Sequence, residues 1–147
     1  MSNEVKRLIL PLMDRRDIRD RKDVDFLVRR FYAQVREHDR LGPVFNHVIE
    51  DWDHHLEHLS DFWEMILFQS GPGRGKFNPN KVHRDVDNKV KNTIDQVHFG
   101  NWLELWFATV TRYFDGENAD FAKEHARRMA HMLFMRIWEA RENPSGK

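Results

Sequence analysis

The sequence predicts an all-α fold, and three observations support this prediction. Apolar residues recur three or four positions apart in several long stretches, which is the spacing of one helix face. No stretch alternates apolar and polar residues with the period of two that a half-buried strand requires. Capping residues and Gly or Pro breaks separate the periodic stretches. We therefore expect helices joined by loops, with no sheet.

The first long helix is predicted from a cap at Asp20 or Asp23 to about Glu37. Its apolar stripe consists of Val24, Leu27, Val28, Phe31 and Val35. The Gly-Pro pair at 42–43 interrupts this pattern. The next residues predict only a short turn, with Phe45 packed inward.

Four helices are predicted in the rest of the chain. One runs from about Glu50 to Phe68, and the next begins at Asn78, a good cap, with Pro79 in the first helical position. A stretch from about 96 to 114 is apolar nearly all round, so it belongs in the centre of the fold. The last helix covers about 118–141.

The chain's 147 residues are most simply one domain with a sizeable core. We place that domain at 21–141. Pro11 breaks the apolar patch near the start, so residues 1–20 are expected to form an N-terminal arm. The tail at 142–147 is expected to be disordered.

Composition excludes several classes of function. The 24 basic and 24 acidic residues balance, so we expect neither a nucleic-acid partner nor an anionic membrane. No apolar run has membrane-spanning length and Met1–Leu10 lacks a signal-peptide pattern, which makes a cytoplasmic location the default expectation. Because the chain has no cysteine, disulfides, thiolate-ligated haem, iron–sulfur clusters and c-type haem attachment are excluded. Histidine remains the favoured metal ligand.

Four polar side chains fall on predicted apolar faces: Tyr32, His55, His83 and Trp102. Each one alone is more often a core residue whose polar tip bonds to the backbone. Together they suggest a shared partner in one core. A haem iron takes an axial imidazole, and dioxygen bound to it, partly negative, accepts hydrogen bonds from the other three.

Four motifs in a fixed order carry a family resemblance. They are FYAQV…LGPVF at 31–45, W-x-x-H…FW at 52–63, NPNKVH at 78–83 and HFGNWLELWF at 98–107. With these motifs the chain resembles the group III truncated haemoglobins of bacteria from about Phe26 to Ile137. It departs from them in lacking a tyrosine near the glycine-rich loop at 70–77, and in a stretch from His83 to Trp102 that is longer than in some members.

The resemblance implies a truncated globin fold, a two-on-two helical sandwich around haem b. It places His83 at the proximal iron ligand, Tyr32 and Trp102 at the distal tyrosine and tryptophan, and His55 at the distal histidine. The implied walls of the haem crevice, besides Trp102, are Phe31, Leu59, Phe62, Trp63 and Phe99.

The function so implied is reversible binding of dioxygen, carbon monoxide or nitric oxide. The alternative is a haem enzyme for nitric oxide dioxygenation or peroxidase-like chemistry, served by an electron-donating reductase. A third hypothesis is a helical interaction module without a cofactor. The sequence does not indicate the oligomeric state.

Two other patterns are weak. The glycine-rich GPGRGK has the wrong spacing for a phosphate-binding loop, and Phe77 replaces the required Ser or Thr. His54 and His58 are four residues apart and could clamp zinc, but their helix face carries Asp61 and is predicted to be solvated.

Overall fold

The computed structural model describes residues 15–74 and 94–142, and within these ranges all regular secondary structure is helical. The elements are α2 (Arg21–Glu37), α3 (Leu41–Val48), α4 (Trp52–Phe68), α6 (Gln96–Tyr113) and α7 (Glu117–Glu142). The predicted all-α class is confirmed, and the four long helices lie within about two residues of their predicted bounds. The helix predicted from Asn78, most of the arm and most of the tail lie outside the described residues.

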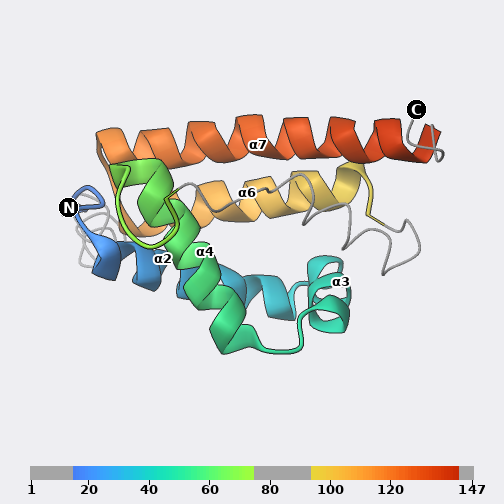
Figure 1. The fold of residues 1–147 in the computed structure, drawn as a ribbon, viewed down its shortest axis with the longest axis horizontal. Coiled ribbons are helices and arrows are strands. Elements are labelled where there is room, and N and C mark those ends of the chain that lie inside the picture. The colour runs from blue at the N-terminus through green and yellow to red at the C-terminus, as the bar shows by residue number, and fades with distance from the viewer. Residues whose placement is uncertain (1–14, 75–93, 143–147) are drawn as a thin grey trace, which may run out of the picture.

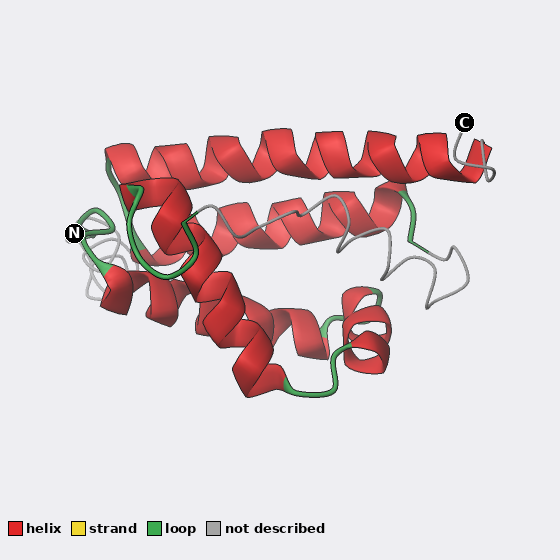
Figure 2. Cartoon of the chain, in the orientation of Figure 1, coloured by secondary structure: helices red, strands yellow, loops and turns green. Residues whose placement is uncertain are grey.

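The helices form two pairs that pack on each other. Helix α2 packs against α4, and α6 packs along α7 (Figure 1). Contacts between α2 and α6 and between α4 and α7 join the pairs, whereas the short α3 rests on α2 and α6. In Figure 2 the two longest red ribbons, α6 and α7, run side by side while α4 crosses α2. This arrangement is a two-on-two sandwich, and α6 is its central helix.

Aspartates begin three of the helices, as the sequence predicted for the first. The carboxylate of Asp20 accepts from the backbone N–H of Asp23 at 3.1 Å, which makes Asp20 the cap of α2. Asp51 caps α4 in the same way. Asp95 caps α6 and forms a reciprocal capping box with His98. Each carboxylate satisfies a backbone donor that the first helical turn leaves without a partner.

Residues 15–20, the described end of the predicted arm, pack against the body of the fold. Ile18 is only 1% exposed. The carboxylate of Asp17 accepts from the backbone N–H groups of Asn118 and Ala119, both at 2.9 Å, and so caps α7 from a distant part of the sequence. Gly116 allows Asp17 to lie this close, because a Cβ at position 116 would be 2.4 Å from Asp17 Cγ. The φ of 148° at this position is also one that residues with a side chain rarely adopt.

The expectation of a mere turn after Gly42 is wrong, because α3 is an eight-residue helix. Pro43 is compatible with it, since Leu41 begins the helix and Pro43 falls in the first turn, where backbone N–H groups have no intrahelical acceptor. Phe45 does point inward, toward Tyr32, with ring centroids 5.9 Å apart.

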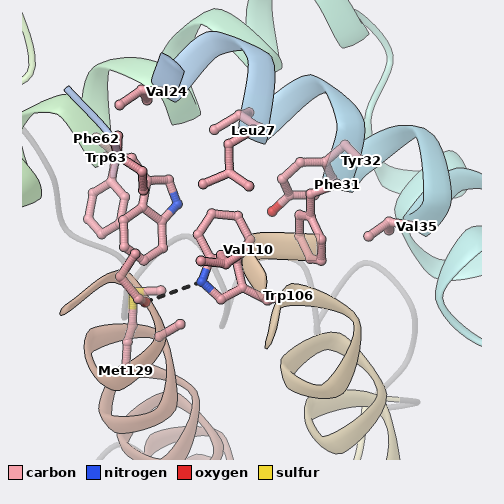
Figure 3. Packing of buried hydrophobic residues seen from close by; sticks show 14 of the residues in the cluster. Val24, Leu27, Phe31, Tyr32, Val35, Phe62, Trp63, Trp106, Val110 and Met129 are labelled. Atoms are coloured by element: carbon pink, nitrogen blue, oxygen red, sulfur yellow. Dashed lines mark hydrogen bonds between the residues drawn. The ribbon is translucent and has the colours of Figure 1, made fainter. Parts of the chain in front are cut away.

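The core is built around aromatic rings of α2, α4 and α6 (Figure 3). Trp106 of α6 is fully buried, and its indole N–H donates to the carbonyl oxygen of Ala122 at 3.2 Å. Trp63 of α4 stacks on it, with ring centroids 4.7 Å apart. The predicted stripe of α2 is at most 2% exposed: Val24, Leu27, Val28, Phe31 and Val35.

Candidate functional site

A cavity of about 470 Å³ lies where α2, α3, α4, α6 and α7 converge. Most of its lining is apolar, and aliphatic residues of α3 and α7 supply much of it: Leu41, Val44, Val48, Ile49, Met129, Ala130 and Leu133. Aromatic polar side chains from three different helices also reach it, namely Tyr32, His55 and Trp102. An apolar enclosure with a few converging polar groups is typical of a small-molecule or cofactor site.

Tyr32 and Trp102 are joined by a hydrogen bond at the wall of this cavity. Since indole nitrogen is a donor only, the Trp102 N–H donates and the Tyr32 hydroxyl oxygen accepts. The proton of the hydroxyl is not used in this bond. It can be donated to a molecule in the cavity, and the bond from Trp102 polarises the hydroxyl in the direction that favours such donation.

Burial keeps Tyr32 protonated. Its side chain is 5% exposed, and burial raises its pKa to about 12, although the hydrogen bond from Trp102 acts in the opposite direction. The hydroxyl is therefore a neutral donor throughout the physiological pH range.

His55 lies beside Tyr32 and faces the same cavity. Its ring meets the Tyr32 ring edge to face, with centroids 6.1 Å apart, and meets Trp52 at 5.8 Å in the same way. The side chain is half-buried, so it has apolar contacts on one side and access to solvent on the other. A histidine in this position can donate or accept a hydrogen bond near a molecule bound beside Tyr32.

The rim of the cavity carries most of its charged and ionisable groups. His54 and His58, on the outer side of α4, are exposed and stack on each other with ring centroids 6.5 Å apart. Across the cavity His98 contacts Asp95, with its Nδ1 2.9 Å from Asp95 Oδ1. Among the described residues no cluster of three or more His, Asp or Glu side chains could hold a metal ion. Within the same part of the chain, the zinc pair considered from the sequence finds no third ligand.

The structure places the predicted site residues in two groups. Tyr32, His55, Leu59, Phe99 and Trp102 line the cavity. Three other expected wall residues, all buried, lie behind the lining instead: Phe31, Phe62 and Trp63.

Of these three residues, Phe31 contacts the lining directly. Phe31 meets the Trp102 ring edge to face at 5.5 Å. Trp63 stacks on Trp106, deeper in the core. The helical spacing puts them on inner faces, but it does not separate a cavity wall from the layer behind it.

His83, the predicted iron ligand, lies outside the described residues. Sequence reasoning in turn missed much of the lining, because only a turn is predicted where α3 lies and no site residue is predicted on α7. Met129 illustrates the second case, since it lies on α7 and lines the cavity. The spacing of Leu41, Val44 and Val48, three and four residues apart, is the signal that could have revealed the contribution of α3.

The cavity has the size and the mostly apolar lining of a cofactor site, with one donor that needs an acceptor. Its volume lies within the range of roughly 300–1,000 Å³ that ligand pockets occupy. The hydroxyl proton of Tyr32 faces a largely apolar cavity, where it needs an acceptor. Haem with a diatomic ligand meets both requirements, and the described residues fit it on the side of Tyr32, His55 and Trp102.

Comparison with known proteins gives one relative in sequence and one in structure. No family model matches the chain. The curated protein "Group 3 truncated hemoglobin ctb" of Campylobacter jejuni subsp. jejuni serotype O:2 is 29% identical over 108 residues, which cover 71% of this chain and 80% of that protein. The crystal structure of group III truncated hemoglobin from Campylobacter jejuni superposes with a TM-score of 0.73. It is 24% identical, and the match covers 84% of this chain and 94% of that one.

The fold is that of a truncated globin, with two helix pairs enclosing a cavity next to α3. Within that class, the sequence relative and the structural match are both of group III, so the resemblance drawn from the four motifs is confirmed. No helix in the described part of the chain is long and apolar enough to cross a membrane.

Proposed function

We propose that this chain holds haem b in its cavity and reversibly binds dioxygen or another diatomic gas there. The observation that carries the proposal is the Tyr32–Trp102 pair, which presents one polarised hydroxyl proton to a largely apolar cavity. The assignment of haem as the cofactor is supported by its relatives, which are named as truncated hemoglobins. Bound haem would supply an iron that takes the gas as a ligand.

The chain's own residues divide the remaining tasks. His83 is the proposed iron ligand, because neutral imidazole is the usual axial donor and the chain has no cysteine. Tyr32 donates to the bound gas, and Trp102 holds the Tyr32 hydroxyl in position. Leu59 and Phe99, which line the cavity, would contact the porphyrin, whereas Phe31, Phe62 and Trp63 belong to the buried core behind the lining.

His55 is the proposed gate. It adjoins the buried Tyr32 ring, is half-buried, and shares the cavity lining with the exposed His54 and His58, so an outward rotation would open a path for gas. Tyr32 can satisfy a bound ligand without it.

The second candidate is redox chemistry in the same cavity, either nitric oxide dioxygenation or peroxidase-like reduction, with electrons from a reductase. His55 favours this candidate, because an imidazole near a bound peroxide can accept a proton from one oxygen and deliver it to the other.

The absorption spectrum of the protein after reconstitution with haemin tests the cofactor. We expect stoichiometric uptake, a strong Soret band and a shift of that band when the reduced protein meets carbon monoxide. A protein that is helical by circular dichroism and takes up no haem would overturn the proposal in favour of the interaction module. Turnover with a reductase, measured beside dioxygen dissociation, then distinguishes carriage from catalysis.

A further inference from the structure

Three tryptophans form a continuous stack that leads away from the cavity. Trp102 and Trp106 of α6 are almost parallel, at 4°, with ring centroids 6.0 Å apart. Trp106 and Trp63 of α4 continue the stack at 19° and 4.7 Å (Figure 3). Other rings around Trp106 are arranged differently, since Phe31 meets it edge to face at 86°. Parallel indoles place their π-electron systems face to face, which favours electron transfer between them.

The two ends of the stack lie in different surroundings. Trp102 lines the cavity and bonds to Tyr32. Trp63 is 3% exposed and contacts the ring of His125, which is half-buried and stacks on the exposed ring of Phe121. The stack therefore spans from the cavity to within one side chain of the surface on α7.

We propose that Trp102, Trp106 and Trp63 form an electron relay between a small reductant at the surface and an oxidant reduced in the cavity. The proposal rests on the proposed haem function and concerns its peroxidase-like alternative, with hydrogen peroxide as the oxidant and ascorbate, in place of a reductase, as the electron donor. Indole and phenol are the side chains of this cysteine-free chain that lose an electron most readily, and the stack connects Tyr32 to Trp63 through them alone.

The reaction balances with two ascorbate anions for each peroxide. Each ascorbate gives up one electron and one proton and becomes the monodehydroascorbate radical. The electron moves to Trp63, then to Trp106 and Trp102, and enters the cavity, while the proton travels through solvent. Two electrons and two protons break the O–O bond and convert one hydrogen peroxide into two waters.

The hydrogen bond of Trp106 suits it to pass electrons along the relay. Its N–H donates to the backbone carbonyl of Ala122, and an amide carbonyl is too weak a base to take that proton. An oxidised Trp106 keeps its proton and its positive charge, so it readily takes an electron from Trp63.

A second electron-transfer route, between Tyr32 and Trp52, is electrostatically disfavoured. The Trp52 and Tyr32 rings lie 6.0 Å apart. The guanidinium carbon of Arg36, however, lies 4.7 Å from the centre of the Trp52 ring. A fixed positive charge there opposes removal of an electron from that indole.

The test uses the haem-loaded protein, treated with hydrogen peroxide in the absence of ascorbate. Electron paramagnetic resonance should detect a tryptophanyl radical, and mass spectrometry should locate oxidised indole products at Trp63. In Trp106→Phe, which keeps an aromatic ring, we expect oxidation at Trp63 to fall to the level of the haem-free protein. Oxidation should accumulate instead at Trp102 and Tyr32.

Two further variants complete the design. Trp138→Phe is the matched control, because Trp138 is 49% exposed and outside the stack, and it should leave oxidation at Trp63 unchanged. Trp63→Phe should abolish oxidation at its own position and raise it at Trp106 and Trp102, which tests the relay even if Trp106→Phe fails to fold. Normal haem uptake with an unchanged oxidation map in the stack variants, or oxidation concentrated at Trp52, overturns the relay alone. Absence of haem uptake overturns the proposed function and the relay together.

Discussion

The indole N–H of Trp102 donates to the hydroxyl oxygen of Tyr32, joining the central helix α6 to α2 at the cavity wall. The sequence predicts that both residues donate directly to a bound gas. In the structure the indole N–H of Trp102 donates to Tyr32 instead. Trp102 therefore affects a bound ligand only through the Tyr32 hydroxyl. This relationship sets the order of effects in the first prediction.

Tyr32→Phe should raise the dioxygen dissociation rate of the haem-loaded protein by roughly tenfold, because one hydrogen bond of about 1.4 kcal/mol is lost. Trp102→Phe should also raise it, and the double variant should be no faster than Tyr32→Phe alone. Stopped-flow displacement of dioxygen by carbon monoxide measures all three rates. Additive effects would show that Trp102 donates to the gas directly, and parental rates in both single variants would show that neither residue is a distal donor.

His83→Ala should strongly weaken haem retention or leave the iron with a substitute ligand, because we propose His83 as the proximal donor. Transfer of haem to apomyoglobin and the ferrous absorption spectrum measure the two outcomes. His131→Ala is a suitable control, since His131 is exposed on α7. A His83→Ala protein with normal haem content and an unchanged five-coordinate ferrous spectrum contradicts the assignment.

His55→Leu should change the rate of carbon monoxide association more than it changes the resting ferrous spectrum. A gate made of His55 opens by rotation past the rim, and leucine alters that motion without removing an iron ligand. Flash photolysis gives the association rate. The opposite result, a six-coordinate low-spin ferrous spectrum that disappears in His55→Leu, would make His55 an internal iron ligand.

Asp23→Asn should destabilise the haem-free protein by about 1–2 kcal/mol at neutral pH, because a charge-assisted pair is lost. The buried carboxylate of Asp23 accepts from Arg16 at 2.6 and 2.7 Å, and from the backbone of Arg19 at 2.8 Å. The hydrogen bond from Arg16 lowers the pKa of Asp23 in the folded state, and burial acts against it.

The sign of the pH dependence follows from this lowered pKa. The contribution of ionised Asp23 to the free energy of unfolding is complete above its pKa in the unfolded chain, about 3.9. It is lost as pH falls through the lower pKa of the folded state. Urea denaturation from neutral to acid pH should therefore show the gap between wild type and Asp23→Asn closing on acidification. Glu124→Gln, which breaks the exposed pair with Arg127, should have no measurable effect. A gap that stays constant to the acid limit would mean that the charge of Asp23 contributes nothing.

Periodicity and capping chemistry made the long helices predictable. The stripe from Val24 to Val35 is read directly from helical spacing, and Asp20 is a capping residue before it. The same reasoning failed for α3, because the Gly-Pro pair was interpreted as a break although both residues fit the first turn of a helix.

The sequence by itself determined the helical class, the cysteine-free chemistry and the candidates Tyr32, His55 and Trp102, since residue type and local spacing suffice for each. Only the tertiary structure decided which inner-face residues line the cavity, that Trp102 donates to Tyr32, and that Trp63 stacks on Trp106. The physical reason is that helical spacing fixes only the direction in which a side chain leaves the axis of its own helix. How helices cross, and so which side chains from different helices meet, depends on packing throughout the core.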